Sequence, residues 1–211
     1  MTSALEPIWL RFAKRLHAIA STGSHFTEGE FDRERYSEIG EIALQMLSLL
    51  GNVPVEVVDS LFPDFGSGYA TPRIDVRGAI IHNGQVLLVQ EKSDGKWTFP
   101  GGYAETGVTL SANVLKEIHE EAGVTCEVVR LMGVRHKAAH AYKPDIREFY
   151  KIFLLCRMLP GQEPKAGVET RDARFFPLDA LPPLSTGRTI HKDIEAAAFY
   201  RANPDAPAFF D

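Results

Sequence analysis

The sequence has only two cysteines, no long apolar run and no excess of basic residues, and each shortage excludes a class of protein. Cys126 and Cys156 lie in alternating apolar segments and form no CxxC pair, which excludes a disulfide framework and favours buried thiols in a reducing compartment. No apolar stretch approaches the roughly 18 residues of a membrane span. The first 20 residues include Arg11, Lys14 and Arg15 and lack a continuous signal core. We therefore expect a cytoplasmic protein with no membrane association.

The charge balance also limits the partners. The chain has 23 Lys and Arg against 28 Asp and Glu, a net charge of −5. A dedicated nucleic-acid surface needs a basic excess, so a nucleic-acid partner is disfavoured. A small nucleotide substrate remains compatible with this charge, because a metal ion can supply the positive charge.

The pattern of the chain changes near residue 70. Residues 7–20 and 32–50 have apolar residues at helical spacing, and a short third helix is expected within 54–61. The next segment is rich in Pro, Gly and Ser and reads as a linker. We therefore predict a small helical domain over 1–62, a linker over 63–71 and a second domain over 72–211. Residues 1–62 are too few to bury their own apolar stripes, so they must pack on the second domain or on another subunit.

Strand patterns dominate after Pro72. The segments RIDVRGAIIH and QVLLVQE flank an Asn-Gly dipeptide, which is the strongest short hairpin signal. EVVRLMGVRHK and REFYKIFLLCRML read as further strands. Helices are expected over 109–122, ending at Gly123, and over 188–200. This mixture predicts an α/β or α+β sandwich.

Three glutamates crowd the predicted helix 109–122. Glu117, Glu120 and Glu121 stand at i, i+3 and i+4 and project from one face. Like charges at these spacings cost about 0.2–0.5 kcal/mol per pair, and carboxylates in a last turn oppose the helix dipole. A divalent cation would relieve this repulsion, and oxygen ligands of this kind select Mg²⁺ or Mn²⁺. A solvated acidic face is the alternative, but the preceding Gly101-Gly102 turn favours a metal site because its backbone can approach a ligand closely.

The segment from Gly102 to Val124 resembles the Nudix box. The positions that match the box at its spacing are Gly102, Glu117, Ile118, Glu120, Glu121, Gly123 and Val124. Two positions depart from it, since Val108 replaces the first box glutamate and Lys116 replaces the arginine. The flanking segments GKWTFPGG and ETRDARFFPLDAL also resemble the family. The resemblance implies a Nudix α/β/α sandwich with a mixed sheet, preceded by a small all-α N-terminal domain.

The resemblance also implies a reaction and a set of ligands. Nudix enzymes hydrolyse the pyrophosphate bond of a nucleoside diphosphate linked to another moiety, with Mg²⁺ or Mn²⁺. The family pattern assigns Glu117 and Glu121 as metal ligands, Glu120 as a ligand or water-mediated partner, and the Gly101 carbonyl as a further ligand. The departures at Val108 and Lys116 leave this carboxylate face intact. The helical extension resembles a subgroup that contains CDP-choline pyrophosphatases and some ADP-ribose hydrolases, and such enzymes are commonly homodimers.

Further site residues are weaker expectations. Glu169 is a distal candidate for the general base, with an exposed loop acid as the equal alternative. Arg77 could meet a substrate phosphate or form a structural ion pair. Trp97 and Phe99 could stack on a base beside Gly102, although such rings more often fill a core.

Two other functions remain open at this level. The first is a non-catalytic Nudix-fold module that senses a nucleotide, which the carboxylate cluster disfavours because a sensor has no need of it. The second is an RNA 5′-pyrophosphohydrolase, against which the negative net charge counts weakly.

Overall fold

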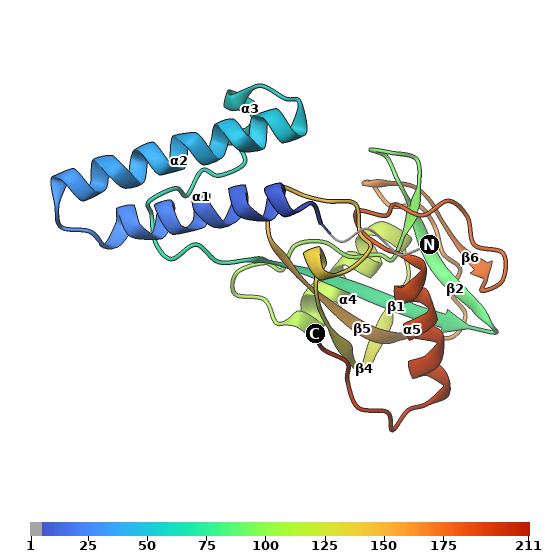
Figure 1. Cartoon of the computed structure of the whole chain (residues 1–211). Helices are drawn as coiled ribbons and strands as arrows, with labels where there is room; N and C mark the ends of the chain where they lie inside the picture. Colours follow the sequence, from blue (N-terminus) through green and yellow to red (C-terminus); the bar gives the residue numbers. More distant parts are fainter. Residues whose placement is uncertain (1–5) are drawn as a thin grey trace. The chain divides into compact units, whose positions relative to one another are not determined.

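The computed structural model describes residues 6–211, which form two compact units. The first comprises residues up to Pro72 together with Pro144–Glu148, and the second comprises Arg73–Lys143 and Phe149–Asp211. Figure 1 shows the elements of both. Within the described residues, no helix is long and apolar enough to cross a membrane.

The first unit is built on two long helices, α1 (Ile8–Phe26) and α2 (Glu30–Gly51), which run side by side (Figure 1), and on the short α3 (Val55–Asp59). The helices extend beyond the predicted ranges by several residues, since the sequence there has no proline to stop them. The small core gathers residues from all three helices and from the returning segment 144–148. Its members are Leu10, Ala13, Leu47 and Val58, with Leu44, Met46, Phe62 and Ile146 packed against them.

Lys14 is the one cation buried on the inner face of α1, and it is balanced by acids. Its Nζ lies 2.6 Å from Glu6 and 2.7 Å from Glu148, both within the same unit. His17 lies one turn further on, with its ring 4.3 Å from that of Phe62. Burial lowers the pKa of His17, so the imidazole is held in its neutral form at neutral pH.

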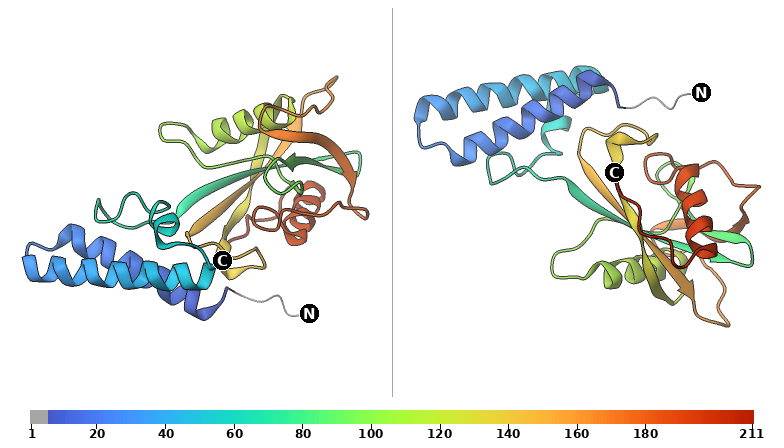
Figure 2. Two further views of the ribbon diagram at one scale, coloured as in Figure 1. Left: turned by 90° about the horizontal axis from the view of Figure 1, so that it is seen from above. Right: turned by 60° about the horizontal axis from the view of Figure 1, so that its bottom comes forward.

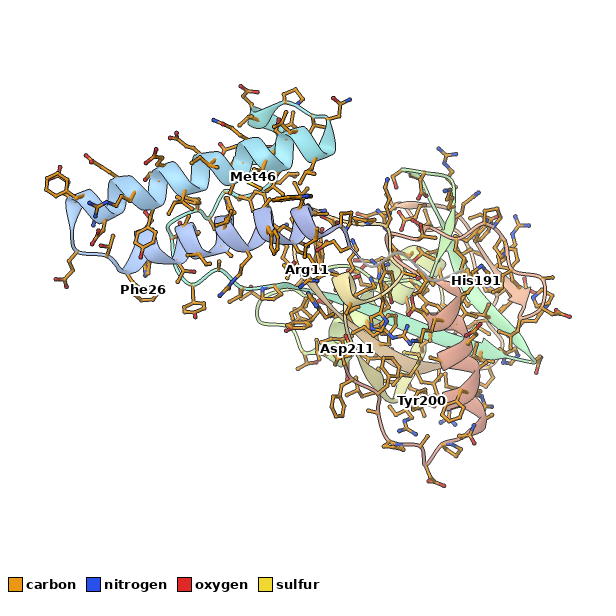
Figure 3. All side chains as sticks on the ribbon, in the orientation of Figure 1. Arg11, Phe26, Met46, His191, Tyr200 and Asp211 are labelled. Atoms are coloured by element: carbon orange, nitrogen blue, oxygen red, sulfur yellow. The ribbon has the colours of Figure 1, made fainter. Side chains whose placement is uncertain are left out.

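The apolar stripe predicted on α1 faces away from this core. Ile8, Phe12, Leu16 and Ile19 keep between 37% and 48% of their surface exposed. Trp9 and Phe26 are more exposed still, at 61% and 64%. Figure 3 marks Phe26 at the end of α1 and Met46 on α2. The helices therefore bury one side of α1 and leave a row of large apolar side chains on the other.

The second unit is a mixed sheet between two helices. The strands are β1 (Arg73–His82), β2 (Gln85–Glu91), β3 (Trp97–Thr98), β4 (Cys126–His136), β5 (Phe149–Met158) and β6 (Thr170–Pro177). The order is β3-β2-β1-β5-β4, with β6 paired to β2. Among the strands of residues 6–211, β1 pairs with β5 in parallel, and the β1–β2, β2–β3, β2–β6 and β4–β5 pairs are antiparallel. The predicted α/β/α sandwich with a mixed sheet is confirmed.

The two faces of this sheet carry separate cores. Helix α4 (Leu110–Ala122) covers one face, where Val114, Ile118 and Ala122 pack on apolar residues of β1, β2 and β5. Helix α5 (His191–Ala202) covers the other with Ile194, Ala197 and Tyr200. Both views of Figure 2 show the yellow-green α4 and the red α5 on opposite sides of the sheet.

The alternation along β1 sorts its side chains between these faces. Val76 and Ile80 face α4, while Asp75, Arg77 and Ala79 belong to the α5 side, because successive strand residues point to opposite faces. The sheet thus brings charged residues of β1 to the edge at which the Gly101-Gly102 turn lies.

Candidate active site

Helix α4 begins and ends at the predicted residues. The Thr109 side chain accepts a hydrogen bond from the Ala112 N–H, 3.2 Å, as a helix N-cap does. Gly123 ends the helix at φ 67°, in the left-handed region that favours glycine. These two caps fix which face of the helix carries Glu117, Glu120 and Glu121.

The glycine turn lies directly against this face. The Gly101 N–H donates a 2.8 Å hydrogen bond to Oε2 of Glu121. Gly101 has φ 143°, and a β-carbon there would lie 2.0 Å from the Val76 carbonyl oxygen. A β-carbon on Gly102 would lie 2.8 Å from Oε1 of Glu117. A side chain at Gly101 would clash with the Val76 backbone, and one at Gly102 would displace the Glu117 carboxylate, so glycine at both positions lets the backbone approach the two carboxylates.

The loop 165–170, which is distant from α4 in sequence, covers the C-terminal end of this helix. The Gly167 N–H and the Thr170 hydroxyl both donate to the Glu121 carbonyl, at 3.2 and 2.7 Å. The Lys165 N–H donates to the Ala122 carbonyl at 2.8 Å. This loop carries the exposed Glu169, whose charge is close enough to raise the pKa of Glu117.

The surroundings of Glu117 and Glu121 disfavour the charged forms of both side chains. Burial raises the pKa of Glu121 to about 7, although Arg77 and the Gly101 N–H act to lower it. Burial also raises the pKa of Glu117, and the charges of Glu120 and Glu169 act in the same direction. Two desolvated carboxylates on adjacent turns are a donor set that suits a hard divalent cation.

The three glutamates do not converge in this structure. Among residues 6–211, no group of three or more His, Cys, Asp and Glu side chains is placed to hold a metal ion together. Glu121 is directed to the Gly101 N–H, whereas Glu120 is exposed and lies 3.9 Å from Lys116. The chemistry of the donors fits a divalent cation, and the side chain of Glu120 would have to turn away from Lys116 to join it.

Lys116 has a partner that the sequence did not reveal. Its Nζ lies 2.6 Å from Oε1 of Glu105, in the loop between the glycine turn and α4. Val108 removes the carboxylate of the first box glutamate, and Glu105 supplies one three residues earlier. Both side chains are nearly half exposed, so the pair is screened by solvent.

Arg77 is a buried structural cation. Its guanidinium donates to Oδ1 of Asp75 at 2.9 Å and to the Phe99 carbonyl at 3.2 Å, and 5% of the residue is exposed. The two readings of Arg77 from sequence were a phosphate contact and an ion pair, and the structure contains the ion pair. Its charge still acts on Glu117 and Glu121, where it opposes the rise in pKa that burial causes.

Asp75 belongs to a charged network that sequence reasoning missed. Oδ2 of Asp75 accepts from Lys151, whose ammonium is completely buried. Burial alone disfavours the Asp75 charge, but Arg77 and Lys151 outweigh it and hold the pKa of Asp75 below its usual value. Burial lowers the pKa of Lys151 to about 8. The sequence signal for this network was Lys151, a charged residue at an inward-facing position of the apolar strand β5, since a buried lysine needs an acidic partner.

The two predicted stacking rings fill the core. Phe99 has no exposed surface, so of its two sequence-based readings the structure agrees with core packing rather than with stacking on a base. Trp97 is 8% exposed, packs edge-on against Phe176 at 4.5 Å and lies beneath the Arg174 guanidinium. Their role in the structure is packing between β3 and the segment around Leu184.

The comparisons with known proteins cover both units. The family model of the NUDIX domain matches residues 72–197, and a model described as the UDP-X-like, N-terminal oligomerisation domain matches residues 7–62. A protein named putative ADP-ribose pyrophosphatase from Bacillus subtilis is 40% identical over 96% of this chain and 97% of its own length.

Two solved structures carry the same likeness. The crystal structure of a UDP-X diphosphatase matches 96% of this chain and 98% of its own, with 32% identity and a TM-score of 0.61. An ADP-ribose pyrophosphatase from Streptococcus suis 89-1591 matches 67% of this chain and all of its own, with 36% identity and a TM-score of 0.60.

Proposed function

The chain belongs to the Nudix hydrolase family, and from this premise we propose that its substrate is ADP-ribose or a closely similar nucleoside diphosphate sugar. It is a pyrophosphohydrolase that acts on a nucleoside diphosphate linked to another moiety. Two of its relatives are named for ADP-ribose, which supports that substrate. The observation that carries the proposal is the desolvated pair Glu117 and Glu121 against the Gly101-Gly102 turn.

Enzymes of this family generally need a divalent metal ion, and we assign Mg²⁺ or Mn²⁺ to the carboxylate face of α4. Glu117 and Glu121 would hold the ion, with Glu120 and the Gly101 carbonyl as further oxygen donors. When bound, such an ion neutralises phosphate oxygens and lowers the pKa of a water molecule. The raised pKa of Glu121 means that binding requires loss of a proton near neutral pH.

The chain's own groups then position the substrate and move one proton. The glycine turn lies beside Glu117 and Glu121, and we place the substrate diphosphate next to this turn and the carboxylate face. Water attacks one phosphorus, the bridging P–O bond breaks, and the leaving phosphate keeps the bonding electrons. Glu169 is our candidate base for the proton of the attacking water. It comes from the loop that caps α4, and its side chain is exposed to solvent.

UDP-linked conjugates are the second candidate class. The solved UDP-X diphosphatase matches almost the whole of this chain, including the helical unit. CDP-choline remains a substrate to assay, because the sequence resembles a subgroup that contains such enzymes.

The helical unit matches an oligomerisation domain, and we assign it a two-fold homodimer. The exposed row on α1 supports this assignment, because it leaves large apolar side chains in solvent, namely Ile8, Trp9, Phe12, Leu16 and Ile19. A second copy of the same row would bury it. Nucleic acid is not expected as a partner, in keeping with the net charge of −5.

A substrate panel tests the proposed function. Purified protein is incubated with ADP-ribose, a UDP-sugar, CDP-choline, NADH and triphosphorylated RNA, each with Mg²⁺, Mn²⁺ or EDTA. We expect ADP-ribose to give AMP and ribose 5-phosphate in equal amounts, only with metal. Turnover of RNA alone would replace the proposed substrate, and binding of ADP-ribose without turnover would indicate a sensor.

A further inference from the structure

An exposed aromatic ring follows the glycine turn directly. Tyr103 is 50% exposed, and its ring lies parallel to that of Phe149, with an interplanar angle of 3° and centroids 5.8 Å apart. Phe149 is buried at the start of β5 and holds the tyrosine ring from behind. A large aromatic side chain that keeps half its surface in solvent while it is stacked on a buried ring is a ready surface for another planar group.

Two cations border this aromatic pair. The guanidinium of Arg73 lies over the Tyr103 ring, 6.0 Å from its centroid, and the ammonium of Lys137 lies 4.9 Å from the Phe149 centroid. Guanidinium and ammonium groups are hydrogen-bond donors, and the edge of a nucleobase carries acceptors for such donors.

Tyr103 directly follows Gly102, the glycine that lies against the Glu117 carboxylate. Gly102 faces Glu117, and Tyr103 is the next residue, with its Cα about 3.8 Å away. Tyr103 pairs with Asp75, so its side chain shares the α5 side of the sheet, whereas Gly102 faces α4. A ligand with a diphosphate on one side of this backbone and a base on the other would cross the edge of the sheet at Gly102.

We propose that Tyr103, supported by Phe149, is the stacking platform for the nucleobase of the substrate. The assignment deepens the proposed function and rests on it, because it takes the Glu117 side of the turn as the diphosphate site. Stacking tolerates any base, since each has a π-face, so Tyr103 sets affinity for the nucleoside half without selecting its identity. The moiety beyond the second phosphate extends away from the platform.

Binding of reaction products tests the platform without turnover. We would titrate the full-length protein with AMP, UMP and ribose 5-phosphate, of which only the first two carry a base. In the wild type, AMP and UMP should bind more tightly than ribose 5-phosphate. Tyr103→Leu keeps apolar cover over Phe149 but removes the π-face. It should weaken AMP binding by about fivefold to 150-fold and leave ribose 5-phosphate binding unchanged.

Matched variants make the result specific. Tyr103→Phe keeps the ring and should bind AMP within about threefold of the wild type. Tyr150→Ala removes a tyrosine of similar exposure, 42%, at the next position of β5, and should change nothing. Tyr103→Ala repeats the test if the leucine variant does not fold. Thermal unfolding of each variant verifies that the protein is intact.

Several outcomes would overturn the platform. These are an unchanged preference for AMP in both Tyr103→Leu and Tyr103→Ala, no preference for AMP in the wild type, or no binding of any of the three ligands. Choline chloride binding that depends on Tyr103 would assign a quaternary-ammonium site instead. Failure of the wild type to hydrolyse ADP-ribose contradicts the proposed function, and it does so in a separate assay from these titrations.

Discussion

The backbone N–H of Gly101 donates a hydrogen bond of 2.8 Å to the carboxylate of Glu121. This contact joins the glycine turn to the last turn of α4. It places the buried Glu121 carboxylate beside the backbone of two glycines, which carry no side chains. The protonation state of Glu121 therefore affects the stability of the fold and, under the proposed function, metal binding as well.

The metal-free protein should lose stability as the pH rises. The pKa of Glu121 is about 7 in the folded chain and 4.5 in the reference state, so its contribution is fully present below pH 4.5 and is lost as the pH rises through 7. The loss is up to about 3 kcal/mol. Urea unfolding of the wild type and of Glu121→Gln at pH 5 and pH 8, in EDTA, measures it. The variant should be the more stable protein at pH 8. Equal pH dependence in both proteins would contradict the burial argument.

Restoring the first box glutamate should do little. In Val108→Glu the new carboxylate would compete for Lys116, which is already 2.6 Å from Glu105. We expect kcat/KM within a few-fold of the wild type. Glu105→Gln and Lys116→Met, which break the exposed pair, should each change the free energy of unfolding by less than about 1 kcal/mol. A tenfold gain in Val108→Glu, about 1.4 kcal/mol of barrier, would show that the natural loop is impaired.

The buried network should be costly to break. Asp75→Asn leaves the charges of Arg77 and Lys151 without their carboxylate, and we expect a loss of about 3–5 kcal/mol in the free energy of unfolding. Asp172→Asn is the matched control, because its partner Arg174 is mostly exposed, and it should cost less than about 1 kcal/mol. Chemical denaturation measures the free energy of unfolding of both variants. Similar losses in Asp75→Asn and Asp172→Asn would refute the claim that the buried network is the more costly one to break.

The apolar row on α1 should govern assembly. Phe12→Lys and Leu16→Lys put charges into the proposed interface, and we expect static light scattering to report a monomer where the wild type is a dimer. Val129→Lys makes the same change at an exposed residue of β4 and should leave the mass unchanged. A wild-type monomer, or a dimer that survives both α1 variants, rules out this interface.

The sequence predicted the elements better than their contacts. Helix α4 was predictable to its ends because Thr109 and Gly123 are local signals whose effect needs no partner. The helical spacing of Ile8, Phe12 and Leu16 was also visible, but not that this stripe stays exposed.

Contacts between distant segments were beyond sequence reasoning. The pairing of Asp75 with Lys151 depends on the parallel register of β1 and β5, which joins residues 76 positions apart. Phe99 looked like a base-stacking ring because it adjoins the glycine turn. Its direction is set by the α5 core, whereas Tyr103, four residues later, is the ring that reaches solvent.

The most direct test compares wild type with Glu121→Gln on ADP-ribose at saturating Mg²⁺ or Mn²⁺. Gln keeps the shape of the side chain and an oxygen that can accept from the Gly101 N–H, but it removes the charge that we propose holds a cation. The account predicts AMP and ribose 5-phosphate from the wild type and a loss of kcat of at least about 100-fold in the variant, or about 2.7 kcal/mol of barrier. A Glu121→Gln enzyme with near wild-type kcat would contradict it.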